Sequence, residues 1–460
     1  MSVVIPPITL IHWTKFFQNA MFEGKDHPIE NECRIPDGIT VNTTDGQAWC
    51  TVTNDHLQLN TSDAVVFHAP DFIDSPENKP AYKGPEQKWV LYSMETPFSS
   101  IFRINQDKMN QFDYLASYHR KSAFLFPYYS PEALDVADRP LPTDFVKSKV
   151  KGAPVLWIAS NCAATNSRQT YIAELMKYIQ VDSYGDCLNN KPWPKDKTRP
   201  QLMSEYKFYL SVENANCEDY VTEKLFDTLK YSSLPIVDGP QSYDGYLPTS
   251  RAAIRMDAYP DPRDLAAYIN FLDADDEAYL SYFDYRRKAL TEAPMERLDR
   301  SFVELWSDQG AHNYHVSWCS ICRKMASTWQ ERQAIPAATE PPKLVESEDG
   351  KSVYRDGYLL VDKTCEPVGK WGYARRGPPY DGFQFTPSPR DEFAYAATGQ
   401  SLTTDDLDTL EASTSVMDNY HVMTFGLILF GMAIVGYIGW LLFQRTNQYR
   451  RLAKDAHTAA

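Results

Sequence analysis

The stretch that decides the fold is YKFYLSVENANCEDYVTEKLFDTLKYSSLPIVDGP, which runs from Tyr206 to Pro240. The apolar run 207–212 predicts a buried strand, residues 220–229 predict a helix with one apolar face, and LPIV at 234–237 predicts a second strand. A strand, a helix and a strand in this order form a parallel unit, in which the helix begins at the carboxyl edge of the sheet. The stretch therefore indicates an α/β fold with a binding edge just after residue 212.

The same alternation extends to both sides of this unit. VLWIASN at 155–161 predicts a strand and QTYIAELMKYI at 169–179 a helix, while further helices are expected from Pro262 and over 277–289. The earlier half contains short apolar runs of strand type, at 8–13, 64–69, 89–94, 115–118 and 124–128. With the charged run KSKVKG at 147–152 as a linker, we expect one domain over 1–150 and a second over 151–330. Residues 331–421, which include Cys365 and are rich in Pro and Gly, are expected to form a spacer or stalk, with a small folded piece around Cys365 as the alternative.

Length and charge exclude two broad classes. A chain of 460 residues is too long for one small binding module. The chain carries 46 Lys and Arg against 61 Asp and Glu, a formal charge of −15, so most of its surface would repel a nucleic acid backbone.

Residues 422–443, VMTFGLILFGMAIVGYIGWLLF, contain no charge, and a helix of this length covers about 33 Å. This pattern predicts one transmembrane helix. Acidic residues precede the span and Arg445, Arg450, Arg451 and Lys454 follow it, so we expect a cytosolic tail at 444–460 and lumenal domains, as in a single-pass Golgi membrane protein.

The start MSVVIPPITLIHWTKFF has no basic region typical of a signal peptide. Two alternatives stay open: a signal peptide upstream of this start, or a tail-anchored cytosolic chain.

The cysteines and sequons favour a lumenal chain. Asn42 and Asn60 stand in the sequons Asn-Thr-Thr and Asn-Thr-Ser and are predicted glycosylation sites. Cys319 and Cys322 have the spacing of zinc ligands, but no second such pair follows, so we expect disulfides there. Asp273 and Asp275 match a metal-binding DxD motif, but they join two predicted helices and follow no strand, so we expect no metal to be bound there.

Candidate binding residues cluster at the predicted sheet edge. Glu223 and Lys224 fall in the first turn of the central helix, beside Asn214 and Tyr220. A helix amino terminus with a lysine suits an anionic ligand such as a diphosphate, and a carboxylate can stabilise positive charge on a sugar ring. The alternative is a surface helix whose Glu-Lys pair only caps its own first turn. Arg168, just before another predicted helix, could also bind phosphate oxygens.

Four motifs in order resemble glycosyltransferase family 10, the α-1,3-fucosyltransferases. FYLSVENANCEDYVTEKLFDTLKYSSLPIVDGP resembles the family's FENS, DYVTEK and PVVLGP signature, and WIASNCAATNSRQTYIAELMKYIQVDSYGDC resembles its SNC, Arg and DxYG block. Upstream, WVLYSMETPFSS resembles the ESP segment and FDYLASYHRKSAFLFPYY resembles the FNWTMSYRRDSD block. The resemblance runs from about residue 13 to residue 322.

This resemblance implies a GT-B fold, with two Rossmann-like domains facing a cleft, and inverting transfer of L-fucose from GDP-β-L-fucose to a glycan hydroxyl. The implied acceptor is GlcNAc of an N-glycan or N-acetyllactosamine, and no cofactor is required. The roles carried over by motif are the diphosphate ligands Arg168 and Lys224, the fucose or nucleotide contacts Asn214, Tyr220 and Glu223, and the general base Glu95. Glu223 would also stabilise the fucosyl cation.

The departures from the family's motifs lie mainly in the acceptor half. FNWT is replaced by Phe112-Asp113-Tyr114-Leu115 and RRDSD by residues 119–123, HRKSA, so the acceptor is the open question. Two alternatives follow: a protein O-fucosyltransferase or other GDP-sugar transferase on the same fold, and a catalytically silent membrane lectin or chaperone.

Overall fold

The structure is a computed structural model that describes residues 2–22, 26–29, 33–129, 132–150, 152, 154–307, 317–334 and 342–372. Within those ranges, none of the helices combines the length and the apolarity that crossing a membrane requires. The predicted transmembrane helix 422–443 and the tail 444–460 lie outside the described residues.

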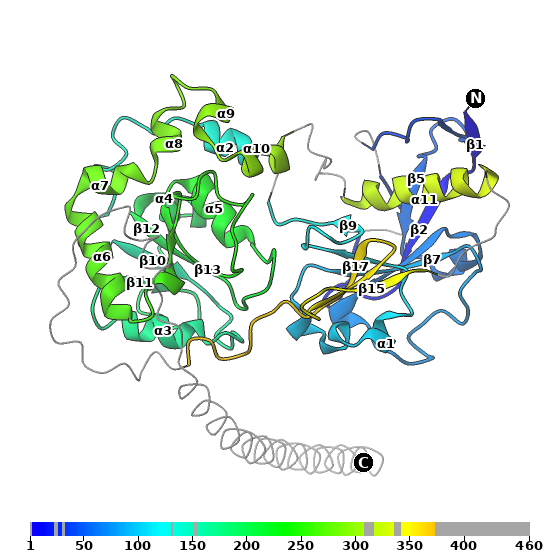
Figure 1. Cartoon of the computed structure of the whole chain (residues 1–460), viewed down its shortest axis with the longest axis horizontal. Coiled ribbons are helices and arrows are strands. Elements are labelled where there is room, and N and C mark those ends of the chain that lie inside the picture. The colour runs from blue at the N-terminus through cyan, green and yellow to red at the C-terminus, as the bar shows by residue number, and fades with distance from the viewer. Residues whose placement is uncertain are drawn as a thin grey trace, which may run out of the picture. The chain divides into compact units, whose positions relative to one another are not determined.

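The second half of the chain builds a sheet of five parallel strands, which we call the sheet of the second lobe (Figure 1). Its order is β11 (Val181–Tyr184), β10 (Val155–Ile158), β12 (Phe208–Val212), β13 (Leu234–Asp238) and β14 (Ile254–Arg255). Every residue of β12 and β13 is buried, as is typical of parallel strands covered on both faces. The helices around this sheet are α3 (Arg168–Leu175), α4 (Arg199–Glu205), α5 (Glu223–Tyr231) and α6 (Pro262–Ala274).

The helices of this lobe begin where the sequence provides caps. The Thr222 side chain accepts a hydrogen bond from the Lys224 amide at the start of α5, and Asp261 caps α6, where Pro262 occupies the first turn. The apolar face of α5 is buried through Leu225, Phe226 and Leu229. Shorter helices complete the lobe: α2 (Ala133–Asp138), α7 (Asp276–Ser281), α8 (Asp284–Arg287), α9 (Pro294–Arg297) and α10 (Arg300–Trp306).

The first half of the chain builds a sheet of seven strands, the sheet of the first lobe. Its order is β3 (Asp26–Pro28), β5 (Cys50–Thr53), β2 (Ile8–His12), β6 (Ala64–His68), β7 (Lys88–Ser93), β8 (Tyr114–Ser117) and β9 (Phe124–Leu125), and β3 alone among them is antiparallel to its neighbour. A separate parallel pair is formed by β1 (Val3–Ile5) and β4 (Ile39–Val41), and α1 spans Gln106–Met109. The 3₁₀ helices of the described residues in this half are η1 (His56–Thr61), η2 (Ala69–Asp71), η3 (Pro97–Ser99) and η4 (Ile101–Ile104), and η5 (Met256–Ala258) lies in the second half. The prediction of an α/β fold with two largely parallel sheets is confirmed.

Helix α11 (Ser317–Ala334) belongs to the first lobe, whereas its sequence position placed most of it in the predicted second domain 151–330. Ile321 and Met325 pack in the core of the seven-stranded sheet. Cys319 and Cys322 are disulfide-bonded, as expected, and their partners are Cys33 and Cys50, also of the first lobe. The chain thus returns to its first lobe after building the second.

The predicted boundary at residue 150 is also displaced. Helix α2 packs in one apolar cluster with α5, and Phe145 lies in the core of the second lobe. In the expected linker KSKVKG, the Lys149 ammonium is buried and donates to the carbonyl oxygens of Ser204 and Ser232, at 2.8 and 2.7 Å. The three lysines of KSKVKG suggested a solvated linker. In the structure, backbone carbonyl oxygens inside the second lobe accept the hydrogen bonds of one of them, Lys149.

Part of the expected stalk 331–421 is folded. Three antiparallel strands, β15 (Leu344–Glu346), β16 (Ser352–Arg355) and β17 (Tyr358–Asp362), form a small sheet. Val353, Leu359 and Val361 are buried in a cluster with residues of the seven-stranded sheet, such as Phe67 and Leu91. Residues 342–362 therefore complete the first lobe and do not act as a spacer.

Candidate active site

The loop between β12 and α5 gathers most of the predicted donor residues. Strand β12 ends at Val212, and the chain reaches the amino terminus of α5 at Glu223 after a loop of ten residues. Asp219 in this loop has a positive φ of 59°, which is uncommon for a residue other than glycine, and it directs the chain so that Tyr220 is buried. The free amide groups at the start of α5 favour an anion at this edge.

A partly buried ion pair lies at the first turn of α5. The Lys224 ammonium lies 3.0 Å from a Glu213 carboxylate oxygen and 3.3 Å from Glu223, and it donates to the Thr222 hydroxyl at 2.8 Å. The Glu213 carboxylate also accepts the Thr222 amide at 2.8 Å. Burial opposes the charge of Lys224, but Glu213 and Glu223 more than offset it, so the pKa of Lys224 is raised. The lysine therefore stays cationic and faces two carboxylates.

The two carboxylates of this cluster differ in their surroundings. Glu213 is 1% exposed, and burial raises its pKa although Lys224 acts in the opposite direction. Glu223 has a side chain that is 43% exposed, and its pKa is lowered because Lys224 and hydrogen bonds outweigh the effect of burial. Glu223 is thus an accessible carboxylate, whereas Glu213 is an internal anchor for Lys224.

Sequence reasoning did not select Glu213. The signal was available: a glutamate that directly follows the predicted buried strand must find a partner, and Thr222 and Lys224 follow in the same unit.

Arg168 is buried at the start of α3 and keeps hydrogen-bonding capacity. Ser167 before it has a φ of 61°, and the Arg168 guanidinium donates to the carbonyl oxygens of Val212 and Asn161. Its Nε has no hydrogen-bond partner among the described residues, and burial lowers the pKa of Arg168. A buried guanidinium with a free donor is a suitable ligand for a phosphate oxygen.

Glu95 follows β7 in the first lobe and is brought to Tyr220 of the second. The Tyr220 hydroxyl donates to the Glu95 carboxylate at 3.5 Å, while the Glu95 carbonyl oxygen accepts from Arg103 at 2.6 Å. The turn at Glu95 is therefore held through its backbone carbonyl oxygen, and the side-chain carboxylate is available to contact another group. Burial raises the pKa of Tyr128, and the charges of Glu95, Glu213 and Glu223 raise it further. Tyr128 therefore lies within electrostatic range of all three carboxylates.

Two more predicted residues lie at the same edge. Asn214 is half-buried and its side-chain oxygen has no hydrogen-bond partner in the described part of the chain. Tyr220 packs against the rings of Tyr118 and Tyr128, at centroid distances of 4.9 and 6.1 Å. Burial raises the pKa of Tyr220, which keeps its hydroxyl protonated and able to donate. The structure thus brings Glu95, Arg168, Asn214, Tyr220, Glu223 and Lys224 to one region.

Among the described residues, the groups with metal-binding atoms already have partners, although Glu218 and Asp219 lie in the loop between β12 and α5. His119, Glu218 and Asp219 have ligand atoms within 4.8 Å of one another, but Arg120 Nε lies 2.7 Å from Asp219 and Lys121 Nζ 3.6 Å from Glu218. The DxD pair is also engaged: Asp275 caps α7, and Asp273 pairs with Lys207 at 3.1 Å. These carboxylates serve ion pairs and a helix cap.

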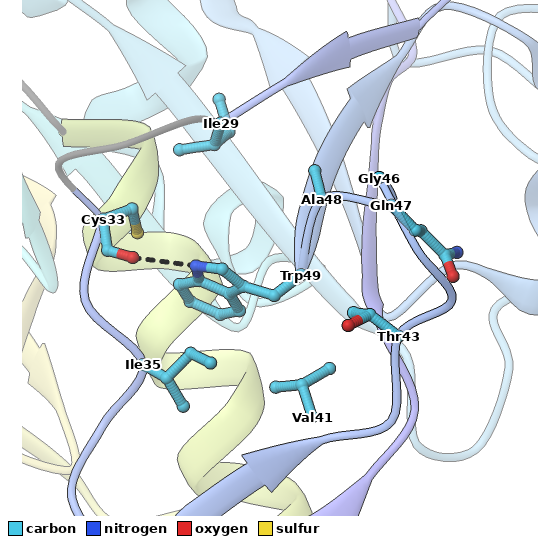
Figure 2. Close-up of a pocket in the computed structure, with 9 residues that line it drawn as sticks. All are labelled: Ile29, Cys33, Ile35, Val41, Thr43, Gly46, Gln47, Ala48 and Trp49. Carbon is cyan, nitrogen blue, oxygen red and sulfur yellow. Dashed lines mark hydrogen bonds between the residues drawn. The ribbon is translucent and has the colours of Figure 1, made fainter.

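A pocket of about 530 Å³ in the first lobe contains none of these residues (Figure 2). The Trp49 indole donates to the Cys33 carbonyl oxygen at 2.8 Å inside it. Its lining consists of Ile29, Cys33, Ile35, Val41, Thr43, Gly46, Gln47, Ala48 and Trp49. Since Cys33 is disulfide-bonded, this lining offers no acid or base and cannot support proton transfer.

Each lobe of the chain matches a domain of a known protein family. Residues 6–129 match the domain described as "Fucosyltransferase, N-terminal", and residues 147–340 match "Glycosyltransferase family 10 (fucosyltransferase) C-term". The chain belongs to glycosyltransferase family 10.

This family 10 chain is similar to the GDP-fucose protein O-fucosyltransferase 3 of Bos taurus, with 32% identity over 292 residues that span 60% of each chain. The protein of the same name from Homo sapiens is 31% identical over 318 residues, which span 65% of this chain and 64% of the relative. The chain thus covers about three fifths of the length of these relatives. A crystal structure of an α1,3-fucosyltransferase with GDP-fucose aligns with 73% of this chain and 93% of its own, at 18% identity and a TM-score of 0.39.

Proposed function

We propose that this chain is a protein O-fucosyltransferase, which transfers L-fucose from GDP-β-L-fucose to a serine or threonine hydroxyl of a protein. The observation that carries the proposal is the cluster of Arg168, Lys224 and Glu223 at one sheet edge, with Glu95 in contact with Tyr220. The relatives named as protein O-fucosyltransferases favour a protein acceptor over the N-glycan or N-acetyllactosamine that the family resemblance first implied.

The donor half of the reaction needs stabilisation of charge on the leaving diphosphate. Arg168 has a free Nε donor, and Lys224 is held cationic beside the amino terminus of α5. Both groups are fixed before the donor arrives, so they can stabilise the charge that develops on GDP without further reorganisation. Asn214 and Tyr220 would contact fucose or nucleotide, and the accessible Glu223 carboxylate would stabilise the positively charged fucosyl ring.

The acceptor half needs a base on the opposite face of the sugar. Inversion requires the acceptor hydroxyl to attack opposite the leaving GDP, and a serine or threonine hydroxyl attacks efficiently only when its proton is removed. Glu95 comes from the first lobe, whereas Glu223 belongs to the donor helix. This separation supports Glu95 as the base.

The nature of the acceptor can be tested by the chemistry of the product. The purified protein is incubated with GDP-[³H]fucose and a panel of secreted, disulfide-containing protein domains and N-glycans. We expect label on protein that reductive alkaline β-elimination releases as fucitol, because an O-linked sugar on serine or threonine leaves in base. Label that a peptide N-glycosidase releases would instead identify the glycan transferase, and GDP-fucose bound without any transfer would identify the silent lectin or chaperone.

We also propose a lumenal Golgi location with a membrane anchor at 422–443. The four disulfides of the described chain favour an oxidising compartment. Asn42, after β4, and Asn60, in η1, are both exposed and open to modification.

Glycosylation tests this location. We expect Asn42→Gln and Asn60→Gln each to increase the gel mobility of the protein made in animal cells by one glycan, and the double variant by two. Treatment with a peptide N-glycosidase should abolish the differences. An unglycosylated wild type, digested by protease added outside intact microsomes, would place the domains in the cytosol.

A further inference from the structure

Residues 364–371, which we call the strap, leave the small sheet of the first lobe and run along the second lobe. The strap begins two residues after the end of β17 and is the yellow-orange segment that approaches α3 in Figure 1. It lies beyond residue 340, where the match to the family's C-terminal domain ends. None of the site residues described above belongs to it.

The strap is bonded to the loops that carry the donor residues. Cys365 forms a disulfide with Cys217, in the loop between β12 and α5. The amide of Glu366 donates to the Asn216 carbonyl oxygen at 2.7 Å, and the amide of Trp371 donates to the Asn166 carbonyl oxygen at 2.9 Å. The amide of Gly369 likewise donates to the Thr165 carbonyl oxygen at 2.7 Å.

Asn166 links the strap to two charged residues of the site. Its side-chain oxygen accepts the Arg168 amide at 3.2 Å, and its side-chain nitrogen donates to the Glu213 carbonyl oxygen at 2.9 Å. The same nitrogen donates to the Asn216 side chain at 2.9 Å. Asn166 is 2% exposed, so these bonds are shielded from water.

The end of the strap is anchored on the sheet itself. Asp238, the last residue of β13, is 2% exposed and accepts the Lys370 ammonium at 2.9 Å and the Trp371 indole N–H at 2.8 Å. The Trp371 ring packs edge-on against Tyr171 of α3, at a centroid distance of 4.7 Å. A buried carboxylate with two charge-assisted bonds is a firm attachment point.

We infer that the strap is a positioning element of the donor site, and that Trp371, Lys370 and Cys365 are positioning residues for GDP binding. The strap holds Asn166 and Asn216 from outside, and Asn166 in turn bonds the backbone of Arg168 and Glu213. Fixing the backbone of the phosphate ligands before GDP arrives strengthens binding, since less order must be created on binding. The inference rests on the proposed function, because it concerns the same GDP site.

Two disulfide variants of the full chain test the inference. Cys217→Ser with Cys365→Ser releases the strap, whereas Cys33→Ser with Cys319→Ser removes a disulfide of the first lobe that does not touch the donor loops. Both pairs are expected to lower the melting temperature. Only the strap variant should weaken GDP binding, by about 3- to 30-fold in calorimetry performed below both melting transitions.

Two further variants separate packing from hydrogen bonding. Trp371→Ala should also weaken GDP binding, and Trp371→Phe should restore part of the affinity because it keeps the contact with Tyr171. If the wild type binds GDP, and the strap disulfide variant and Trp371→Ala bind it with the same affinity, the inference is wrong. The proposed function is not affected by that result. A wild type that does not bind GDP would overturn the proposed function and the inference with it.

Discussion

Glu95→Gln is expected to lower kcat for fucosyl transfer by about 100- to 10,000-fold, which is the usual contribution of a positioned general base. The amide has the shape of the carboxylate and can still accept the hydrogen bond from Tyr220, but it cannot take the acceptor proton. Because the turn is held by the Glu95 carbonyl oxygen and Arg103, the substitution should leave the fold unchanged. The affinity for GDP, measured by calorimetry, should therefore stay within about twofold.

Two other carboxylates make the result specific. Glu77, an exposed glutamate of the first lobe, provides the control, and Glu77→Gln should retain full activity. Glu223→Gln should also lower kcat, because the developing positive charge on fucose loses its stabilising carboxylate. If the Glu95→Gln enzyme keeps most of its turnover, another carboxylate is the base, and Glu223 is the first to examine.

Lys224→Ala is expected to weaken GDP binding by about 10- to 150-fold, because one charge-assisted hydrogen bond contributes about 1.5–3 kcal/mol. The change should also lower the melting temperature, since it leaves the Glu213 carboxylate buried without its cation. The double variant Lys224→Met with Glu213→Gln removes both charges. It should recover stability without recovering GDP affinity.

The matched control for Lys224 is on the same helix. Lys230 pairs with Glu132 at 2.7 Å, and both side chains are partly exposed, so Lys230→Ala should leave the GDP affinity unchanged. Equal GDP affinity in Lys224→Ala and Lys230→Ala would show that the diphosphate binds elsewhere.

The second lobe was predictable because its signals are local. The apolar run before Glu213 and the run LPIV coincide closely with β12 and β13, and the helix between them begins at the cap Thr222. Each element is specified by residues within a few positions of itself. The candidate donor residues stand at the ends of these elements, but their roles came from the family resemblance, because the residues alone left a helix cap as the alternative.

The features that were missed depend on distant partners. Cys319 pairs with Cys33 across 286 residues and Cys217 with Cys365 across 148, and no spacing rule fixes such pairings. Helix α11 and strands β15–β17 return to the first lobe after long excursions, so sequence order placed them in the wrong unit. Lys149 looked solvated because its carbonyl partners lie more than 50 residues away.

A crystal structure of the protein with GDP bound tests the donor site most directly. We predict that the diphosphate lies at the amino terminus of α5, with oxygens within hydrogen-bonding distance of Arg168 and Lys224 and with the Glu95 carboxylate facing the vacant fucose position. A diphosphate bound away from Arg168 and Lys224 would show that these residues do not form the donor site.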